Sequence, residues 1–346
     1  MKTVHYPHLS LPFRLVAAAL LLLSVQLRAQ VAFRVMEYNV ENLFDCDHDS
    51  LKNDYEFLPD NPKGWTPERY REKLANISKV ILAASNPQVP DLVGLCEVEN
   101  SRCVTDLVKN SPLKDSAYEF AMTDSPDERG IDVVLLYQPS SFKHLATQSI
   151  RIPVEDPSRR PTRDILHVAG QVISGDTLDV FVCHLPSRSG GEAKSEPYRL
   201  QVAGVLRLAA DSVMNCRQSP NVIIMGDFND YPSNRSISKV LGAVKPGKKP
   251  QKRTLYNLMD GKSGGTYRYQ GEWGTLDNFL VSGNLLKGNK KLKTSYDKAQ
   301  ILQFPFLLEE DDKYGGPTPF RTYWGKKYHG GFSDHLPVAV DFIIKN

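Results

Sequence analysis

Carboxylate, amide and imidazole side chains recur in this sequence where short apolar runs begin or end. Three such places are the run 92–96 followed by Glu97, the run 222–225 followed by Asp227 and Asn229, and the run 336–344 preceded by Asp334 and His335. Apolar runs of this length are typical of buried strands, so the polar groups are expected at strand ends. Because hard divalent cations prefer oxygen ligands, the pattern indicates one polar site that could hold such a cation.

Further polar residues occupy similar places. Asn39 and Asn42 follow the expected first strand, His184 ends the run 180–183, and Asp277 lies within the segment 275–279. Each has an ordinary structural explanation, since Asn and Asp often form turns. Their number is harder to explain in that way, because burying so many polar groups is costly unless they pair with one another or with a cation.

Hydrophobic periodicity indicates the helices that would support these residues. Helices are predicted over 66–84 and 101–110. Thr66-Pro67-Glu68 is a typical helix start, with an N-cap, a proline at the first position and an acid in the first turn. Pro197 is predicted to open a further helix, with an inward face made of Val202, Val205, Ala209 and Val213.

The expected strands come both as hairpins and alternating with helices. They cover residues 32–38, 92–96, 131–137, 165–173, 177–185, 222–225, 276–281 and 336–344. The two runs on either side of Ser174-Gly175-Asp176 predict a hairpin. This mixture favours sheets inside and helices outside over a purely parallel doubly wound sheet.

The first 29 residues have the order of a secretory signal peptide. Lys2 and Arg14 precede the apolar stretch 15–25, which is too short to span a bilayer, and Ala29 fits the residue before a cut. We therefore expect an exported protein, periplasmic or extracellular, with one domain over residues 30–346. An uncleaved anchor is the alternative. Residues 1–29 hold three basic residues and no acid, so cleavage would lower the formal net charge from +3 to zero and remove a basic excess typical of nucleic-acid binding.

The composition is ordinary for a globular protein, with 41% hydrophobic and 24% charged residues among 346. The five cysteines are irregularly spaced and form no disulfide framework. A single bridge, such as Cys46–Cys103, stays open. We expect a monomer with no stable membrane span.

Six short motifs together resemble the endonuclease/exonuclease/phosphatase superfamily. They are Met36-Glu37-Tyr38-Asn39-Val40, Leu95-Cys96-Glu97-Val98, Cys183-His184-Leu185-Pro186, Gly226-Asp227-Phe228-Asn229, Leu276-Asp277-Asn278-Phe279 and Ser333-Asp334-His335. They occur in the family's order, and the segment 41–45 resembles a secreted bacterial branch. The resemblance implies an α/β fold of the DNase type, a four-layer α/β/β/α sandwich with two mixed β-sheets packed face to face.

The resemblance also implies a metal-dependent hydrolase of phosphate esters. Glu97 is similar to the main Mg²⁺ ligand, Asn39 to its companion, and Asp334 to a residue that supports the metal or its waters. Mn²⁺ or Ca²⁺ could take the same place. Mg²⁺ in proteins keeps several waters and needs only one or two carboxylates, which suits this set.

The remaining motif residues resemble catalytic groups. Asp227 and Asn229 are similar to the pair that orients the attacking water and holds a phosphate oxygen. His335 would offset charge at the phosphate, and Asp277 would fix its tautomer. His184 resembles a second histidine of the DNase branch, and its acid or arginine partner stays open among Glu128, Arg129 and Asp132.

Substrate contacts are expected from three more residues. Arg188 lies in the glycine-rich loop 186–191, Arg268 lies in the aromatic segment 266–273, and Asn42 ranks below Asn39 as a metal ligand. We expect an endonuclease-type phosphodiesterase that uses metal-assisted in-line attack of water. The alternative is a phosphatase or phosphodiesterase for small phosphates or phospholipid headgroups, of the sphingomyelinase or inositol-phosphatase kind. An inactive binding protein on the same fold is the third possibility.

Overall fold

The computed structural model describes residues 30–154, 159–288 and 290–345, so the expected signal peptide lies outside the described residues. The helices are α2 (Pro67–Ala83), α3 (Ser101–Lys109) and α4 (Glu192–Cys216). Short helical turns are η1 (Tyr55–Phe57), η2 (Lys114–Ser116), η3 (Ser236–Val240), η4 (Tyr296–Lys298) and η5 (Pro305–Leu307). The strands are β1 (Gln30–Leu43), β2 (Leu92–Val98), β3 (Glu119–Met122), β4 (Asp132–Tyr137), β5 (Phe142–Ile150), β6 (Ile165–Val172), β7 (Thr177–His184), β8 (Val222–Asp227), β9 (Leu255–Asn257), β10 (Tyr267–Tyr269), β11 (Glu272–Gly274), β12 (Asp277–Ser282), β13 (Leu292–Lys293), β14 (Ala299–Ile301), β15 (Leu308–Glu310), β16 (Pro317–Pro319), β17 (Tyr323–Trp324), β18 (Lys327–Tyr328) and β19 (Val338–Lys345).

Two large mixed sheets form the centre of the molecule. The first has the order β13-β19-β1-β2-β4-β3, with β14 also paired to β19, and the second has the order β5-β6-β7-β8-β12-β9. Strand β1 is parallel to β2 and antiparallel to β19. Strand β7 is parallel to β8, which is antiparallel to β12. The predicted hairpin is β6–β7.

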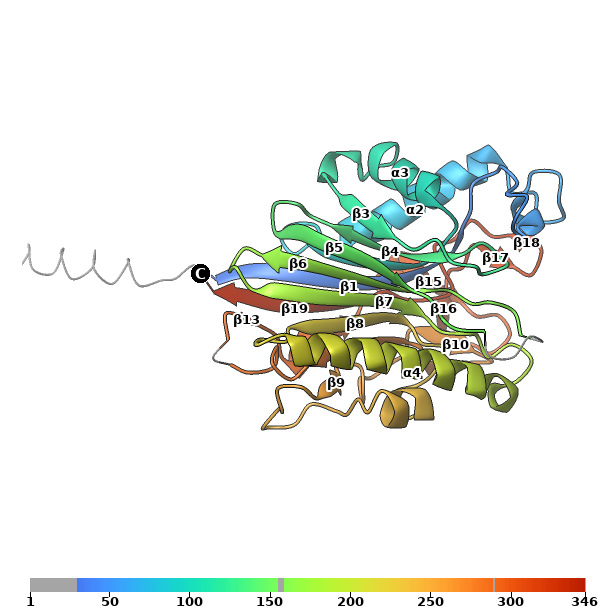
Figure 1. Ribbon diagram of the computed structural model, residues 1–346. Coiled ribbons are helices and arrows are strands. Elements are labelled where there is room, and N and C mark those ends of the chain that lie inside the picture. Colours follow the sequence, from blue (N-terminus) through green and yellow to red (C-terminus); the bar gives the residue numbers. More distant parts are fainter. Residues whose placement is uncertain (1–29, 155–158, 289, 346) are drawn as a thin grey trace, which may run out of the picture.

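The sheets pack face to face between two layers of helices (Figure 1). Apolar side chains from both sheets, among them Val35, Val133, Val180 and Phe279, form the central core. A second core joins the first sheet to α2 and α3, and a third joins the second sheet to α4. The predicted four-layer α/β/β/α sandwich is therefore confirmed.

The start of α2 agrees with the sequence prediction. Thr66 is the N-cap and Pro67 opens the helix, and the Thr66 side chain accepts the backbone N–H of Arg69 at 3.5 Å. This contact satisfies one of the backbone donors that a helix leaves unpaired at its start.

The predicted start of the third helix is wrong. Helix α4 begins at Glu192, five residues before Pro197, and its buried face includes Val202, Ala203, Leu206, Ala210 and Met214. The buried Arg199 explains the difference: its guanidinium donates to the Glu192 carbonyl at 3.3 Å and pairs with Asp230 at 2.8 Å. These contacts fix the helical turns around Pro197. They could not be predicted from the local sequence pattern.

Among the described residues, no helix combines the length and apolar character needed to cross a membrane.

Candidate active site

The alternation of side chains along β1 delivers polar groups to the layer between the sheets. Phe33 and Val35 belong to the central core, whereas Met36 and Tyr38 pack toward the helices. Because successive side chains of a strand point to opposite faces, Glu37 and Asn39 continue the inward series. Both are almost fully buried.

The second sheet brings three more polar residues to the same layer. Val182, Met225 and Phe279 belong to the central core, and His184, Asp227 and Asp277 each lie two residues away along β7, β8 and β12. The strand register makes them lateral neighbours, because His184 is opposite Asp227 and Asp227 is opposite Asp277.

Glu97 reaches the site by a different route. Leu95 packs toward the helices and Cys96 toward the other sheet, so a regular strand would direct Glu97 toward the helices. The register of β2 against β4 shifts between Cys96 and Val98, and Glu97 has a φ of 67°. Bulges of this kind redirect a side chain. The Glu97 carboxylate accordingly lies 3.9 Å from His184 Nε2.

Asp227 lies at the centre of the cluster. Its Oδ2 accepts hydrogen bonds from Asn39 Nδ2 at 3.1 Å and Asn229 Nδ2 at 3.2 Å, and its Oδ1 accepts the backbone N–H of Asn229 at 2.8 Å. The same Oδ2 lies 3.5 Å from His184 Nε2 and 3.8 Å from His335 Nε2. Two imidazoles and two carboxamides therefore surround one buried carboxylate.

His335 and Asp277 form a buried pair, with His335 Nδ1 2.7 Å from Asp277 Oδ2. Burial acts to lower the pKa of His335, but the carboxylates of Asp277 and Asp227 outweigh it and raise this pKa well above its ordinary value. His335 is therefore protonated at neutral pH. The Tyr267 ring packs on its imidazole with ring centroids 5.0 Å apart.

Burial raises the pKa of Asp227 to about 7, opposed by His335 and assisted by the negative charge of Asp277. Glu37, which the sequence analysis did not single out, lies behind this group. Burial, and then the charges of Asp277 and Asp227, raise its pKa well above the ordinary value. Its only sequence signal is an acid within an apolar strand. The raised pKa values of Glu37 and Asp227 mean that it is unfavourable for all of these carboxyl groups to be ionised together.

His184 has the opposite electrostatic setting. Burial, with the nearby cations of Arg163 and Arg129, lowers its pKa well below the ordinary value, so the imidazole is neutral. Its Nδ1 is buried and has no hydrogen-bond partner among the described residues. Arg163, which donates to the Leu185 carbonyl at 2.7 Å, is a neighbour that the sequence analysis did not assign.

The three residues left open as partners of His184 make other contacts. Asp132 accepts hydrogen bonds from Thr123 and from the backbone of Ser125, and Glu128 pairs with Arg160 at 3.2 Å. Arg129 donates to Asn42 Oδ1 at 2.6 Å. Of the three, Arg129 acts on His184 through its charge.

The donors around the cluster suit a hard divalent cation. Glu97, Asn39 and Asp334 contribute oxygen atoms, and Glu97 Oε2 is oriented by the backbone N–H of Asn42 at 3.1 Å. In the part of the chain that the structure describes, the buried oxygens Glu37 Oε2 and Asp277 Oδ1 have no hydrogen-bond partner. Ligand atoms of Asp227, Asp277 and His335 lie within 4.8 Å of one another. A cation held by Glu97, with Asn39 and Asp334 beside it, would offset this negative charge.

A network of buried charges supports Asp334. Arg321 donates to Asp334 Oδ2 at 2.6 Å and lies 3.5 Å from Glu41, which accepts the backbone N–H of Thr322. From α2, Lys73 donates to Thr322 Oγ1 at 2.6 Å and to the Phe332 carbonyl at 2.7 Å. Burial lowers the pKa of Lys73 to about 8. These partners come from distant parts of the chain, so the sequence analysis missed them.

The backbone of the site is strained. Among the described residues, six that are not glycine have positive φ, and four of them lie here: Glu41, Asn42, Glu97 and Asn229. Such conformations are unfavourable for residues with a side chain and concentrate at functional sites.

The two arginines that were expected to contact the substrate, Arg188 and Arg268, instead bind carboxylate and carbonyl groups of the protein. Arg188 donates to the Asn229 carbonyl and pairs with Asp230 at 3.2 Å. Arg268 pairs with Asp311 at 2.9 Å and donates to the carbonyls of Gly271 and Gly315. The structure thus brings together seven of the predicted residues, namely Asn39, Glu97, His184, Asp227, Asn229, Asp277 and His335. Asp334, next to His335 in the chain, is held by Arg321. The guanidinium groups of Arg188 and Arg268 support neighbouring loops.

This chain belongs to the endonuclease/exonuclease/phosphatase family, whose family model matches residues 34–344. The class defined by the fold and the site is thus a metal-dependent hydrolase that acts on phosphate ester bonds. No curated protein matches the sequence significantly.

Solved structures share the fold. A Bacteroides thetaiotaomicron protein described as an endonuclease/exonuclease/phosphatase family protein is 14% identical, with a TM-score of 0.57 over 92% of this chain and 97% of its own. The human Nocturnin catalytic domain is 19% identical, with a TM-score of 0.55 over 91% and 97%. A Bacteroides thetaiotaomicron mannosyl-6-phosphatase is 14% identical, with a TM-score of 0.56 over 90% and 99%. At these identities the likeness concerns the fold alone.

Proposed function

We propose that this protein is a Mg²⁺-dependent phosphoesterase that hydrolyses small phosphate esters by direct attack of water. The observation that carries the proposal is the position of Asp227, whose carboxylate lies beside two imidazoles and accepts hydrogen bonds from two carboxamides. A base, a cationic group and fixed hydrogen-bond donors around one point are what displacement at phosphorus requires.

Asp227 is the general base in this proposal. Its pKa of about 7 lets the carboxylate accept a proton from water near neutral pH. The amide groups of Asn39 and Asn229 hold the carboxylate in one orientation. Because Asp227 and the attacking water exchange only a proton, no covalent enzyme intermediate is needed.

The two histidines have different roles. His335 is kept protonated by Asp277 and Asp227, so its charge can offset the negative charge that develops on the phosphoryl oxygens. Asp277 fixes the ring orientation through Nδ1, which leaves Nε2 directed toward Asp227. His184 is neutral and contributes a hydrogen bond without adding charge.

A bound divalent cation would polarise the phosphate ester and stabilise its developing negative charge. We assign Glu97 as its principal ligand, with Asn39 and Asp334 beside it. Mg²⁺ is favoured because it needs few protein carboxylates, and Mn²⁺ and Ca²⁺ are the alternatives.

Small esters are favoured over nucleic acid by the charges around the cluster. Arg163 pairs with Asp127 at 3.2 Å, Arg188 with Asp230 at 3.2 Å, and Arg321 with Asp334 at 2.6 Å. Carboxylate partners reduce the attraction that these cations exert on a polyanion. The endonuclease-type diesterase predicted from the sequence is the second candidate, supported by the two histidines beside Asp227, which resemble the DNase branch.

We also propose export to the periplasm or the medium, supported by the signal-like order of residues 1–29. Fractionation of expressing cells and N-terminal sequencing of the product test this point. A product that stays in the cytoplasm with its first 29 residues would contradict it.

The decisive experiment measures hydrolysis of small phosphate mono- and diesters, inositol phosphates, sphingomyelin and plasmid DNA, with and without Mg²⁺. Glu97→Gln is compared with Glu99→Gln, a buried glutamate two residues away that does not contact the cluster. We expect the unmodified protein to hydrolyse small esters when Mg²⁺ is present. Glu97→Gln should abolish this activity, and Glu99→Gln should retain it. Rapid DNA cleavage with no turnover of small esters would replace the first candidate with the second, and activity that survives EDTA would refute the metal dependence.

A further inference from the structure

A pocket of about 350 Å³ opens beside the proposed catalytic cluster of Asp227, Asp277 and His335. One wall is the β10–β11 hairpin, and the other is the segment 311–324. Asp334 and Tyr267 line it, and Tyr267 also packs on the His335 imidazole. The pocket is therefore separated from the His335 imidazole by the Tyr267 ring, next to the place where the phosphate group would react.

Exposed aromatic rings are concentrated in this pocket. Among the described residues, five Phe, Tyr or Trp side chains are at least 38% exposed, and three of them line it: Tyr269 at 63%, Tyr314 at 44% and Trp324 at 45%. Large exposed apolar groups that gather in one place mark binding surfaces more often than isolated ones do. Aromatic faces stack well on other rings.

The walls of the pocket are held in place by hydrogen bonds. Arg268 joins the hairpin to the opposite wall through Asp311 at 2.9 Å and the Gly315 carbonyl at 2.6 Å. Asp311 also accepts the backbone N–H groups of Lys313 at 2.9 Å and Tyr314 at 3.0 Å. A prearranged aromatic wall loses little freedom when a ligand binds, which favours affinity.

Size and charge restrict the occupant. Ligand pockets span roughly 300–1,000 Å³, so this one is near the small end and suits a single ring system. Arg268 and Arg321 each have a carboxylate partner, Asp311 and Asp334. Of the three cations that line the pocket, Arg268, Lys313 and Arg321, two are thus paired, which weakens the attraction for a nucleic-acid backbone.

From these features we infer that the pocket, here called the aromatic pocket, binds the ring-bearing organic group of the ester whose phosphate lies at Asp227. The inference rests on the proposed phosphoesterase function and names its substrate class: phosphate esters of a single nucleoside or monosaccharide. Both sources share the chemistry that the pocket recognises, a compact ring with polar substituents next to a phosphate.

The test compares three alcohols, each as its phosphate monoester and its methyl phosphate diester: glycerol without a ring, a hexose and a nucleoside. We expect kcat/KM for at least one ring-bearing ester to exceed that of the glycerol ester by about 10-fold, a typical effect of stacking one ring. The hexose and nucleoside arms show which source is preferred.

Variants connect this preference to the pocket. Tyr269→Ala and Tyr314→Ala are expected to raise KM for the preferred ester by about 10-fold and to leave the glycerol ester within about 2-fold. Tyr55→Ala is the matched control, because Tyr55 is 54% exposed and does not line the pocket. Equal losses on all esters, or no loss on any, would overturn the inference and leave the phosphoesterase function intact.

Binding measured by calorimetry gives a readout that does not require turnover. With Asp227→Asn, the preferred nucleoside or hexose phosphate should bind about 10-fold more tightly than glycerol phosphate, and Tyr314→Ala should remove the difference. If Asp227→Asn binds all three phosphates equally, the aromatic pocket has no role in recognition. Absence of hydrolysis of every ester by the unmodified protein would refute the proposed function instead.

Discussion

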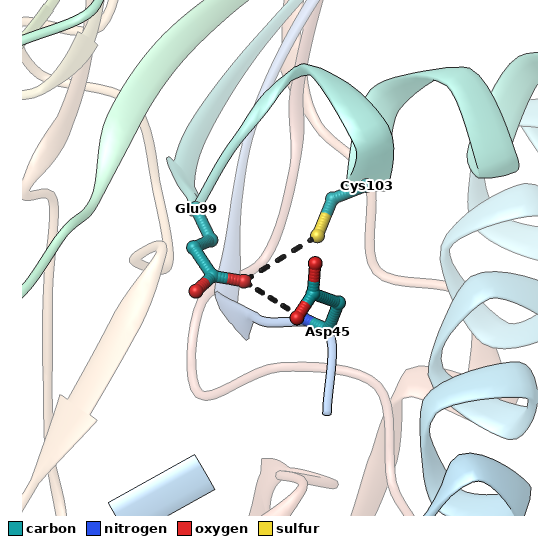
Figure 2. A group of neighbouring side chains, drawn as sticks. All are labelled: Asp45, Glu99 and Cys103. Carbon is teal, nitrogen blue, oxygen red and sulfur yellow. Dashed lines mark hydrogen bonds between the residues drawn. The ribbon is translucent and has the colours of Figure 1, made fainter. Parts of the chain in front are cut away.

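Two buried clusters in this molecule carry similar ligand types and are built in different ways. Asp227, Asp277 and His335 belong to the proposed active site and are called the catalytic cluster. Asp45, Glu99 and Cys103 form what we name the carboxylate–thiol cluster (Figure 2). In each, the possible ligand atoms lie within 4.8 Å of one another. Residue types and proximity alone would therefore rank them equally.

The carboxylate–thiol cluster uses its groups to fix the chain. Glu99 accepts the backbone N–H of Asp45 at 2.8 Å and the Cys103 thiol at 3.8 Å, as Figure 2 shows. Asp45 in turn accepts the side-chain amide of Asn100, the N-cap of α3, at 3.1 Å. These contacts tie the segment after β1 to the start of α3.

The catalytic cluster contains buried atoms whose hydrogen-bonding ability is not used. Among the described residues, the buried atoms without a hydrogen-bond partner include Glu37 Oε2, His184 Nδ1 and Asp277 Oδ1, which all lie at or beside this cluster, and none from Asp45, Glu99 or Cys103. Since an unpaired buried polar group costs free energy, such atoms point to a ligand that is bound during function. Between these two clusters, buried atoms without a partner therefore distinguish the proposed active site where residue type does not.

The largest expected effect comes from the base of the catalytic cluster. Asp227→Asn keeps the shape of the side chain and removes its ability to accept a proton from water, so kcat should fall by about 10³-fold. Steady-state kinetics on the preferred ester measure this, with Glu99→Gln as the control from the other cluster. If kcat fell by a comparable factor in Asp227→Asn and Glu99→Gln, the proposed functional difference between the two clusters would be wrong.

Lys73 tests the long-range support of the catalytic cluster. Lys73→Met removes the cation that holds Thr322 and Phe332 and lies near Glu41, and breaking such a buried group should lower the free energy of unfolding by about 3 kcal/mol. Urea denaturation provides the measurement. Lys143→Met, an exposed position on β5, should change stability by less than about 0.5 kcal/mol. Equal stability of the two variants would show that the buried network contributes little.

Metal affinity should separate the two clusters directly. Glu97→Gln is expected to weaken the apparent affinity for Mg²⁺ by about 10–100-fold, the range seen when metal coordination is perturbed. Titration calorimetry of the EDTA-treated protein measures the effect, and Cys103→Ser should leave the affinity unchanged. A loss of Mg²⁺ binding in Cys103→Ser alone would place the cation in the carboxylate–thiol cluster.

Counted per pH unit, the smallest expected effect concerns the pH dependence of stability. Burial raises the pKa of Glu99 from its ordinary value of 4.5 to about 8. Between these values the folded state holds a proton that the unfolded chain has released, so stability falls as pH rises, by at most about 1.4 kcal/mol per pH unit. Glu99→Gln should flatten this part of the profile. Denaturation midpoints from pH 5 to 8 provide the check, and an unchanged slope would contradict the assignment.

The strand ends of the catalytic site were predictable from the sequence because apolar runs stop at Asp227, His184 and Glu97. The local pattern also predicted the α2 start and the β6–β7 hairpin. It could not predict the bulge that turns Glu97 inward, which depends on pairing between β2 and β4. The contributions of Lys73 and Arg321 to the site could not be predicted either, since some of their partners are distant in the chain.

The roles of cations were the least predictable feature. Arg188 and Arg268 lie in segments whose composition suits phosphate or ring binding, and the structure shows each paired with a carboxylate. Whether a cation serves the substrate or the protein depends on the acids that the fold places beside it. Arg268 still contributes to the inferred ring site, since it fixes the aromatic walls.

The pairing of β1 with β19 has a consequence for biosynthesis. Residues 30–37 lie opposite residues 338–345, so the middle of the first sheet joins the two ends of the described chain. A nascent polypeptide that stopped just before Val338 would contain His335 but would lack the strand that holds it against Asp277. Molecules that lack β19 are therefore expected to have no partial activity, which makes catalysis a readout of whether this strand is present.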